Sequence, residues 1–115
     1  MARGNGAAGE YDKRIRFERA VASENSFGED EETGWEPLGG AVWAKVSYGT
    51  GEDRRDAAQE GASIFATFRV RKSAATAAVT ERDRISFGRA WEISSIVPWG
   101  DRDLEFTAKA RKAAP

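Results

Sequence analysis

Residues 64–71 read Ile-Phe-Ala-Thr-Phe-Arg-Val-Arg, and this stretch indicates the fold of the whole chain. Its even-numbered residues are apolar, whereas three of its four odd-numbered residues are Thr or Arg. Such alternation is typical of a β-strand that has one face in a core and the other in solvent. The stretch therefore predicts a half-buried strand.

Similar alternation recurs on both sides of this stretch. Six further strands are predicted, at residues 13–21, 33–38, 41–48, 84–87, 90–97 and 102–108. Turn residues separate most of them, and no long amphipathic helix interrupts the series. The pattern indicates an all-β fold, a small antiparallel β-barrel or sandwich of about six or seven strands with one long polar loop.

Local features refine this prediction. Gly88-Arg89 predicts a two-residue type II′ turn between the strands at 84–87 and 90–97, because glycine suits its first position. Arg19 falls on the apolar face of the strand at 13–21, which predicts that this strand leaves the core there. Residues 73–80 are rich in Ala and predict a small-residue connection.

The predicted core consists of residues on the apolar phase of their strands. They are Phe17, Val46, Phe68, Ile85, Trp91, Ile93 and Phe106. Large aromatic side chains contribute much of the buried surface in a domain of this size. The same reasoning favours Trp43 and Trp91 as core and inter-strand packing residues.

Composition excludes several kinds of chemistry. The 115 residues include 18 Lys and Arg, 19 Asp and Glu, and neither His nor Cys, for a net charge of -1. A disulfide, a zinc–thiolate site and a thiol nucleophile are therefore excluded, and the commonest general base is absent. We expect a protein that is not an enzyme, binds no cofactor, and is soluble and intracellular, with no membrane segment.

The chain divides into three predicted regions. Residues 1–10 are rich in Gly and Ala and predict a flexible N-terminal arm. Residues 11–108 hold the predicted strands and form the barrel domain. Residues 109–115 are predicted to be a basic C-terminal tail, which carries Lys109, Arg111 and Lys112.

Charged clusters are candidate contact sites. An acidic run comprises Glu29, Asp30, Glu31 and Glu32, and its spacing does not match a calcium-binding loop. Its interpretations are a solvated hairpin tip or a charged contact with a neighbouring protein. Basic residues gather at Arg69, Arg71 and Lys72, where a solvated strand face is the alternative to a contact.

Residues 49–62 form the predicted long polar loop. Its candidate functional residues are Gly49, Gly51, Glu52, Asp53, Arg54, Arg55, Asp56, Gln59 and Glu60. The Gly-Thr-Gly opening lacks the third glycine of a phosphate-binding loop, so it indicates a strand-ending turn. Most hairpin loops need only about 2–5 residues. The loop is therefore either a mobile connection or a functional element.

The four tryptophans leave a second interpretation open. Trp35, Trp43, Trp91 and Trp99 could form a stacking platform for single-stranded nucleic acid, as some small barrels do. A nucleic-acid-binding barrel normally shows a concentrated basic face, and the net charge of -1 argues against one. A generic protein-interaction domain also remains possible.

An ordered set of motifs carries a family resemblance. In chain order these are KRIRF (13–17), TGWEPL (33–38), AVWAKV (41–46), ATFRVR (66–71), TERDRI (80–85), FGRAWEI (87–93) and DLEF (103–106). The set resembles the head–tail joining family of tailed phages, the small head-closure or stopper proteins, also found in gene-transfer particles. The resemblance covers roughly residues 13–108.

The resemblance implies a β-barrel subunit in a ring of about six or twelve copies. Such a ring lies between the portal or adaptor ring and the tail-terminator or tail-tube ring, closes the DNA-filled head and docks the tail. An adaptor or a tail terminator is an alternative within the same neck. The implied location is the neck of a virion or phage-like particle, which is assembled in the bacterial host cytoplasm.

The family's loop after the Val-Trp-Ala strand projects towards the ring lumen or a neighbouring ring, which corresponds to residues 49–62 here. DNA could pass through that lumen. The remaining charged clusters become candidate contacts between subunits or rings. These are Glu29, Asp30, Glu31, Glu32, Arg69, Arg71, Lys72, Lys109, Arg111 and Lys112.

Overall fold

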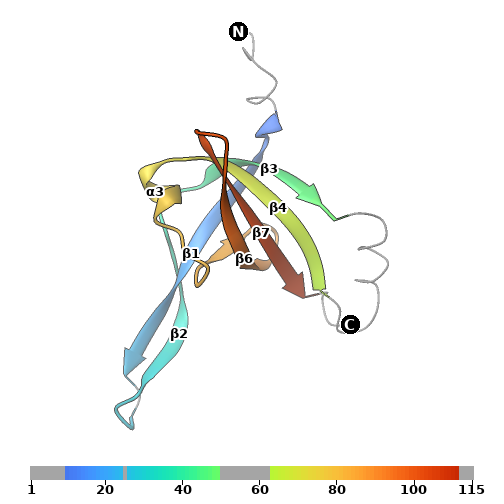
Figure 1. Cartoon of the computed structure of the whole chain (residues 1–115). Helices are drawn as coiled ribbons and strands as arrows, with labels where there is room; N and C mark the ends of the chain where they lie inside the picture. The colour runs from blue at the N-terminus through green and yellow to red at the C-terminus, as the bar shows by residue number, and fades with distance from the viewer. Residues whose placement is uncertain (1–9, 25, 50–62, 112–115) are drawn as a thin grey trace.

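A computed structural model describes residues 10–24, 26–49 and 63–111 (Figure 1). Their secondary structure consists of seven strands and one short helix. In chain order these are β1 (Lys13–Glu24), β2 (Asp30–Pro37), β3 (Val42–Tyr48), β4 (Ser63–Arg71), α3 (Ala74–Ala77), β5 (Arg84–Ser86), β6 (Ala90–Trp99) and β7 (Asp103–Arg111). None of the described helical segments is long and apolar enough to cross a membrane.

The strands form one antiparallel sheet that closes on itself. Their order is β2-β1-β3-β4-β7-β6-β5, and an additional pairing joins β5 back to β1. Six strands therefore make a barrel, and β2 lies outside it. Closure leaves fewer unpaired strand edges than an open sheet would expose. This arrangement confirms the predicted all-β antiparallel barrel.

Strand β1 pairs with three partners along its length. Lys13–Ile15 pair with β3, Arg16–Glu18 pair with β5, and Glu18–Glu24 pair with β2. Beyond Glu18 the strand has left the barrel wall and forms a two-stranded ribbon with β2. We call residues 19–37 the projecting hairpin, because it extends away from the barrel (Figure 1).

The core fills the barrel interior with inward-facing side chains of the six barrel strands. Phe17, Phe68, Ile85 and Phe106 are at most 2% exposed, and Trp91 and Ile93 are also buried. Phe17 and Phe106 have ring centroids 5.0 Å apart, and Phe68 meets Trp91 edge-on at 5.4 Å. Six of the seven predicted core residues are thus confirmed. Val46 is only half-buried and packs against the edge of the core.

The turn between β5 and β6 is longer than predicted. Ser86 and Ala90 form the last pair of the ladder, so Phe87, Gly88 and Arg89 make a three-residue turn. Gly88 has φ +73°, which favours glycine. Phe87 lies outside the ladder, and its ring packs edge-on against Phe68, 6.1 Å away. The prediction of a two-residue turn was therefore wrong by one residue.

Strand β7 continues three residues beyond its predicted end at 108. Ala108 and Ala110 are buried, and Lys109 and Arg111 pair in register with β4. Alanines give a weak apolar phase, so the alternation at this end was missed in the sequence. Lys109 and Arg111 therefore belong to the barrel wall.

The Ala-rich connection at 73–80 contains the short helix α3. Ser73 begins it with a capping box, in which its side chain accepts from the Thr76 backbone and the Thr76 hydroxyl accepts from the Ser73 backbone. Thr76 is buried and also donates to the Arg71 carbonyl at 3.0 Å. These bonds attach the connection to the end of β4.

Candidate interaction surfaces

The outer face of β4, β7 and β6 carries paired charges. Arg69 lies 3.1 Å from Glu105 on the neighbouring strand, and its guanidinium stacks 3.7 Å from the Trp99 ring centroid. Arg71 lies 3.2 Å from Asp103. Both predicted contact arginines therefore already have partners within the chain, which makes them poorer candidates for a contact with another subunit.

Tyr11 packs on this same face ahead of β1. Its ring lies 5.0 Å from the Arg71 guanidinium carbon, and the side chain is buried. Burial, together with the hydrogen bond and negative charge of Asp103, raises the pKa of Tyr11 to about 12. Lys45 forms an ion pair with Glu10 at 3.3 Å. The segment that precedes the barrel is thus held against the barrel wall from Glu10 onward.

Arginines cover the faces of three of the four tryptophans. Arg14 lies 4.7 Å from the Trp43 ring and Arg84 lies 4.1 Å from the Trp35 ring, in addition to the contact at Trp99. Trp43 is 52% exposed, so its predicted place in the core was wrong: it faces outward, opposite Ala44. Ring faces that stack on arginine do not form an open platform for bases, and the geometry does not favour the nucleic-acid interpretation.

The acidic run lies in a strand and not at a hairpin tip. Asp30, Glu31 and Glu32 belong to β2 and pair with residues 22–24 of β1. The predicted place in the hairpin tip was wrong for these three residues, because both strands extend further than their sequence patterns indicated. Glu29 is exposed immediately before β2.

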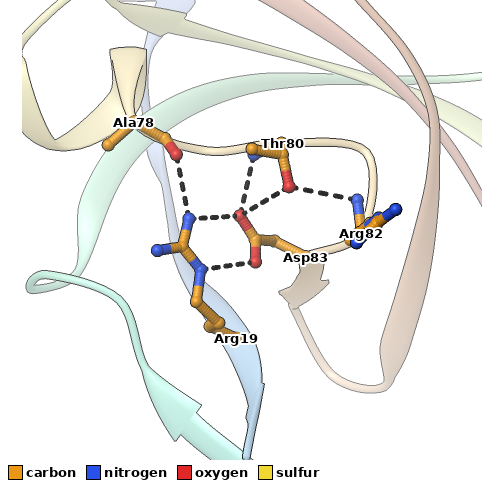
Figure 2. Close-up of polar contacts among 5 residues, drawn as sticks. All are labelled: Arg19, Ala78, Thr80, Arg82 and Asp83. Carbon is orange, nitrogen blue, oxygen red and sulfur yellow. Dashed lines mark hydrogen bonds and ion pairs between the residues drawn. The ribbon is translucent and has the colours of Figure 1, made fainter.

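A buried carboxylate fixes the root of the projecting hairpin, as Figure 2 shows. Arg19 donates from Nε to Asp83 Oδ1 at 2.9 Å and from an Nη to Asp83 Oδ2 at 3.0 Å. The same Nη donates to the Ala78 carbonyl at 3.0 Å. Arg19 therefore ties β1, where it leaves the barrel, to the connection between α3 and β5. This confirms the prediction that the strand leaves the core at Arg19.

Asp83 is also held in place by hydrogen bonds within its own turn. Its Oδ2 accepts from the Thr80 backbone at 2.7 Å and from the Thr80 hydroxyl at 3.3 Å, and the side chain is only 2% exposed. Burial by itself raises the pKa of Asp83, but the bonds from Arg19 and Thr80 and the Arg19 charge outweigh it and lower that pKa overall. The carboxylate is therefore ionised at neutral pH.

Open hollows lie on the barrel surface. One is lined by Arg71, Lys72, Asp101 and Arg102 and has a volume of about 480 Å³. A second, of about 310 Å³, is lined mainly by apolar and aromatic side chains. Its residues are Tyr48, Ile64, Phe87, Gly88, Arg89 and Trp91.

The remaining predicted site residues are distributed as follows. The Gly49 amide donates to the Phe65 carbonyl at 3.2 Å and ends the β3–β4 pairing, as expected of a strand-ending turn. Lys72 is exposed beside the first hollow, and Lys109 is half-buried in β7. Residues 50–62 and Lys112 lie outside the described residues. Within the described ranges, no group of three or more acidic residues could hold a metal ion.

Comparison with known proteins gives the family. The sequence model of the family described as phage head completion protein matches residues 7–111, which is most of the chain. The chain belongs to the phage head completion protein family. This finding confirms the resemblance that the ordered motifs indicated. The role of the family is structural: its members complete the head of a phage-type particle.

A solved structure shares the head completion protein's fold. The similar chain is described as part of the virion of a native gene transfer agent particle, with a TM-score of 0.63 and 24% sequence identity. The match covers 90% of this chain and 96% of that chain. No curated protein matches the sequence.

Three features of this head completion protein were missed from its sequence. Asp83 is one, although its position three residues after Thr80 is a turn signal that could have suggested a local carboxylate–amide bond. Arg102 is another, because only folding brings it beside Lys72, whose amide donates to the Arg102 carbonyl at 2.7 Å. Phe27 is the third. It stands alone among polar turn residues and is 84% exposed.

Proposed function

We propose that this head completion protein forms a homo-oligomeric ring in the neck of a phage or gene-transfer particle. The ring lies between the portal or adaptor and the tail, closes the DNA-filled head and provides the surface on which the tail docks. It acts without catalysis, as a structural part. The observation that carries this proposal is the family match over residues 7–111.

The shape of the chain supports assembly into a ring. A closed barrel gives a rigid body, and the projecting hairpin reaches beyond it (Figure 1). Rings of identical subunits use two unlike surfaces on each copy, which meet across a repeated interface. This chain offers such unlike surfaces, because the hairpin sequence is acidic from Glu29 to Glu32 whereas Lys72 and Arg102 lie together on the barrel.

The long polar segment is the proposed gate. Residues 50–62 connect β3 to β4, two adjacent antiparallel strands that need only a short turn. Its carboxylates would repel DNA phosphates, and Arg54 and Arg55 could pair with them or contact DNA when the channel opens. In the proposed ring the segment reaches the lumen or a neighbouring ring and helps to retain packaged DNA.

Particles assembled without this protein test the proposed role. We expect heads that package DNA but then leak it or fail to join tails, and addition of the purified protein should restore closed, tailed particles. Native mass spectrometry of the purified protein, alone and with neck components, measures the ring. A protein that stays monomeric in both settings, or particles that are complete without it, would contradict the proposal.

Replacement of residues 50–60 by a short Gly-Ser turn tests the gate separately. The barrel should fold and the ring should form, because residues of the barrel strands and of the connection before β5 make the described core. Particles that carry the variant should package DNA but lose it or fail to join tails. A Glu81→Ser variant at an exposed turn is the control and should behave as wild type. Normal DNA retention and normal infectivity or transfer with the shortened segment would rule out the gate.

A further inference from the structure

The projecting hairpin has two strand edges that pair with no other strand of the described structure. Strand β2 is the last strand of the sheet and pairs only with β1. Glu18 pairs with both Pro37 of β2 and Arg84 of β5, so β2 and β5 lie on opposite sides of β1. The pairing with β5 ends at Glu18. We call the outer side of β2 the β2 edge, and the side of β1 that faces away from β2 at residues 20–24 the β1 edge.

The hydrogen-bond pattern shows which backbone groups point to these edges. Phe17 and Leu38 form a bonded pair, because the Leu38 amide donates to the Phe17 carbonyl at 2.8 Å. Bonded and non-bonded pairs alternate along an antiparallel ladder, so the pair three positions further on, Ala20 with Trp35, is non-bonded. The amide and carbonyl of Trp35 therefore point to the β2 edge, and those of Ala20 point to the β1 edge. Two residues further along β1, the backbone of Ala22 points the same way as that of Ala20.

The chain carries a proline on another free edge but not on these two. Among the described strands, β6 beyond Glu92 pairs with β7 alone, and Pro98, which has no amide hydrogen, lies in that stretch. Proline and charged residues are common means of preventing strand pairing at a free edge. Residues 19–36 contain no proline, and their acidic run, at 29–32, lies near the turn. These charges disfavour random pairing of free copies, and both edges keep their amide donors.

The root of the hairpin is fixed relative to the barrel. Arg19 is bonded to Asp83, and Arg84 lies 4.1 Å from the Trp35 ring and 2.7 Å from Glu18. A strand that is already oriented loses less conformational entropy when it pairs. Identical copies therefore present their hairpins in the same orientation to their barrels.

We propose that the β2 edge of one copy pairs with the β1 edge of the next copy, so that the hairpins form a continuous β-structure around the ring. The inference rests on the ring proposed above and names its interface. Rotation about the ring axis carries each hairpin into the next without reversing it. Strand β2 therefore meets the next β1 in antiparallel orientation, as it does within one hairpin. The two edges are unlike, which is the heterologous kind of contact that generates a closed ring.

Symmetry favours the β1 edge of a second copy as the partner. Pairing of β2 with another β2 needs a two-fold axis, and a ring whose two faces meet the head and the tail has none. A short ladder is sufficient, since three residue pairs each join β1 to β3, β1 to β5 and β5 to β6 in the barrel itself. Pairing around the ring removes both free edges and gives neighbours to a ribbon that is marginally stable alone.

A photo-crosslinker on β2 tests which edge it meets. p-Benzoyl-phenylalanine replaces the exposed Glu36, and mixing of isotope-labelled and unlabelled chains distinguishes links between copies. Irradiated rings should yield peptides that link position 36 of one copy to residues 19–24 of another. The same amino acid at Val97, an exposed site on the barrel wall, is the control and should not give this link.

Each crosslinking outcome gives a decision. Rings that form without a link from position 36 to residues 19–24 of another copy overturn the inference and leave the proposed function intact. A link to residues 30–37 of another copy shows β2–β2 pairing, and a link to a different component of the particle shows another occupant; each overturns the inference. A chain that forms no ring, either alone or in particles, overturns this inference together with the ring.

A proline on the β1 edge tests the backbone contact. Ala22→Pro removes an amide that points away from β2, so the hairpin ladder keeps its bonds and urea unfolding should stay close to wild type. The concentration at which half of the chains are in rings should rise about tenfold or more, because one edge hydrogen bond is lost and the proline ring obstructs the approaching strand. Ala22→Val keeps the amide and is the matched control, with ring formation as in the wild type.

Equal ring formation by Ala22→Pro and wild type would overturn the inference. If Ala22→Pro does not fold, the link from position 36 decides between the outcomes by itself, because Glu36 is exposed and its replacement leaves the barrel core intact.

Discussion

The barrel and the projecting hairpin of this chain are built by different means. Each barrel strand has neighbours on two sides, and the residues of the core cluster come from the barrel strands and the connection before β5. None of the described core residues comes from β2 or from β1 beyond Phe17. The hairpin instead depends on its ladder and on the Arg19–Asp83 bonds at its root. Apolar burial therefore sets the stability of the barrel, whereas polar contacts set the direction of the hairpin.

This contrast predicts that the largest loss of stability comes from the barrel. Trp91→Ala removes a buried ring and the bond to the Phe87 carbonyl, so unfolding should become about 3–5 kcal/mol easier. Trp43→Ala removes an outward-facing ring of the same size and should cost about 1 kcal/mol or less. Urea unfolding measures both variants. A loss below about 1 kcal/mol for Trp91→Ala would mean that burial does not dominate in the barrel.

A smaller loss is expected at the hairpin root. Asp83→Asn removes the charge that Arg19 and Thr80 satisfy and should destabilise the fold by about 1–3 kcal/mol at neutral pH. Because folding lowers the pKa of Asp83, its contribution is present above the ordinary value of 3.8 and is lost as the pH falls through the lowered pKa. The difference between variant and wild type should therefore shrink in acid.

Unfolding of both proteins in urea across an acidic pH series measures this effect. Asp101→Asn, at an exposed turn, is the matched control and should unfold as the wild type does at every pH. A gap between Asp83→Asn and wild type that stays constant from neutral to strongly acidic pH would show that the carboxylate charge is not what holds the hairpin root.

Tyr11 gives a third expectation, on the outer wall of the barrel. Tyr11→Phe should destabilise by about 1 kcal/mol at neutral pH, because Asp103 loses a hydrogen-bond donor. Folding raises the pKa of Tyr11 from 10.0 to about 12, so its contribution is present below pH 10 and disappears as the pH rises through about 12. The variant and the wild type should converge there.

Alkaline titration at the absorbance of tyrosinate tests this expectation. The difference between the wild-type and Tyr11→Phe curves isolates Tyr11 and should show a midpoint near 12. A midpoint of the difference curve near 10 would mean that the Tyr11 side chain is exposed to water, and would contradict its packing against the barrel wall.

The smallest effect on stability is expected in the hairpin's acidic run. Reversal of Glu29, Asp30, Glu31 and Glu32 to Lys should change the free energy of unfolding by only about 0.5 kcal/mol, because this part of the chain lies on the hairpin, outside the barrel. Ring or tail assembly should nevertheless weaken, and the deficit should shrink above about 0.1 M salt, where exposed charges are screened beyond about 10 Å.

Sedimentation and particle assembly at two salt concentrations measure this prediction. Reversal of Glu81, an exposed residue outside the hairpin, to Lys is the control and should leave assembly unchanged. If the charge-reversed variant assembles as efficiently as the wild type, the acidic run does not take part in the interface.

Local alternation was sufficient to predict the strands and most of the core. The period of two depends only on neighbouring residues, and it correctly assigned Phe68, Ile85 and Phe106 to the interior. It failed where the inward residues are small, as at Ala108 and Ala110, because alanine contributes little to the apolar phase. The core prediction for Trp43 was wrong for another reason: it gave aromatic character more weight than the alternation, which places Trp43 on the face opposite Ala44.

The sequence by itself determined the all-β class, the inward faces of the barrel strands and, through its motifs, the family. Only the tertiary structure decided how β1 divides its pairing among β2, β3 and β5, and which carboxylate Arg19 meets. Arg19 and Asp83 are 64 residues apart, and no local period relates residues at that separation. Closure of the barrel pairs β5 with β1 and so brings Asp83, just before β5, beside Arg19 at the root of the hairpin.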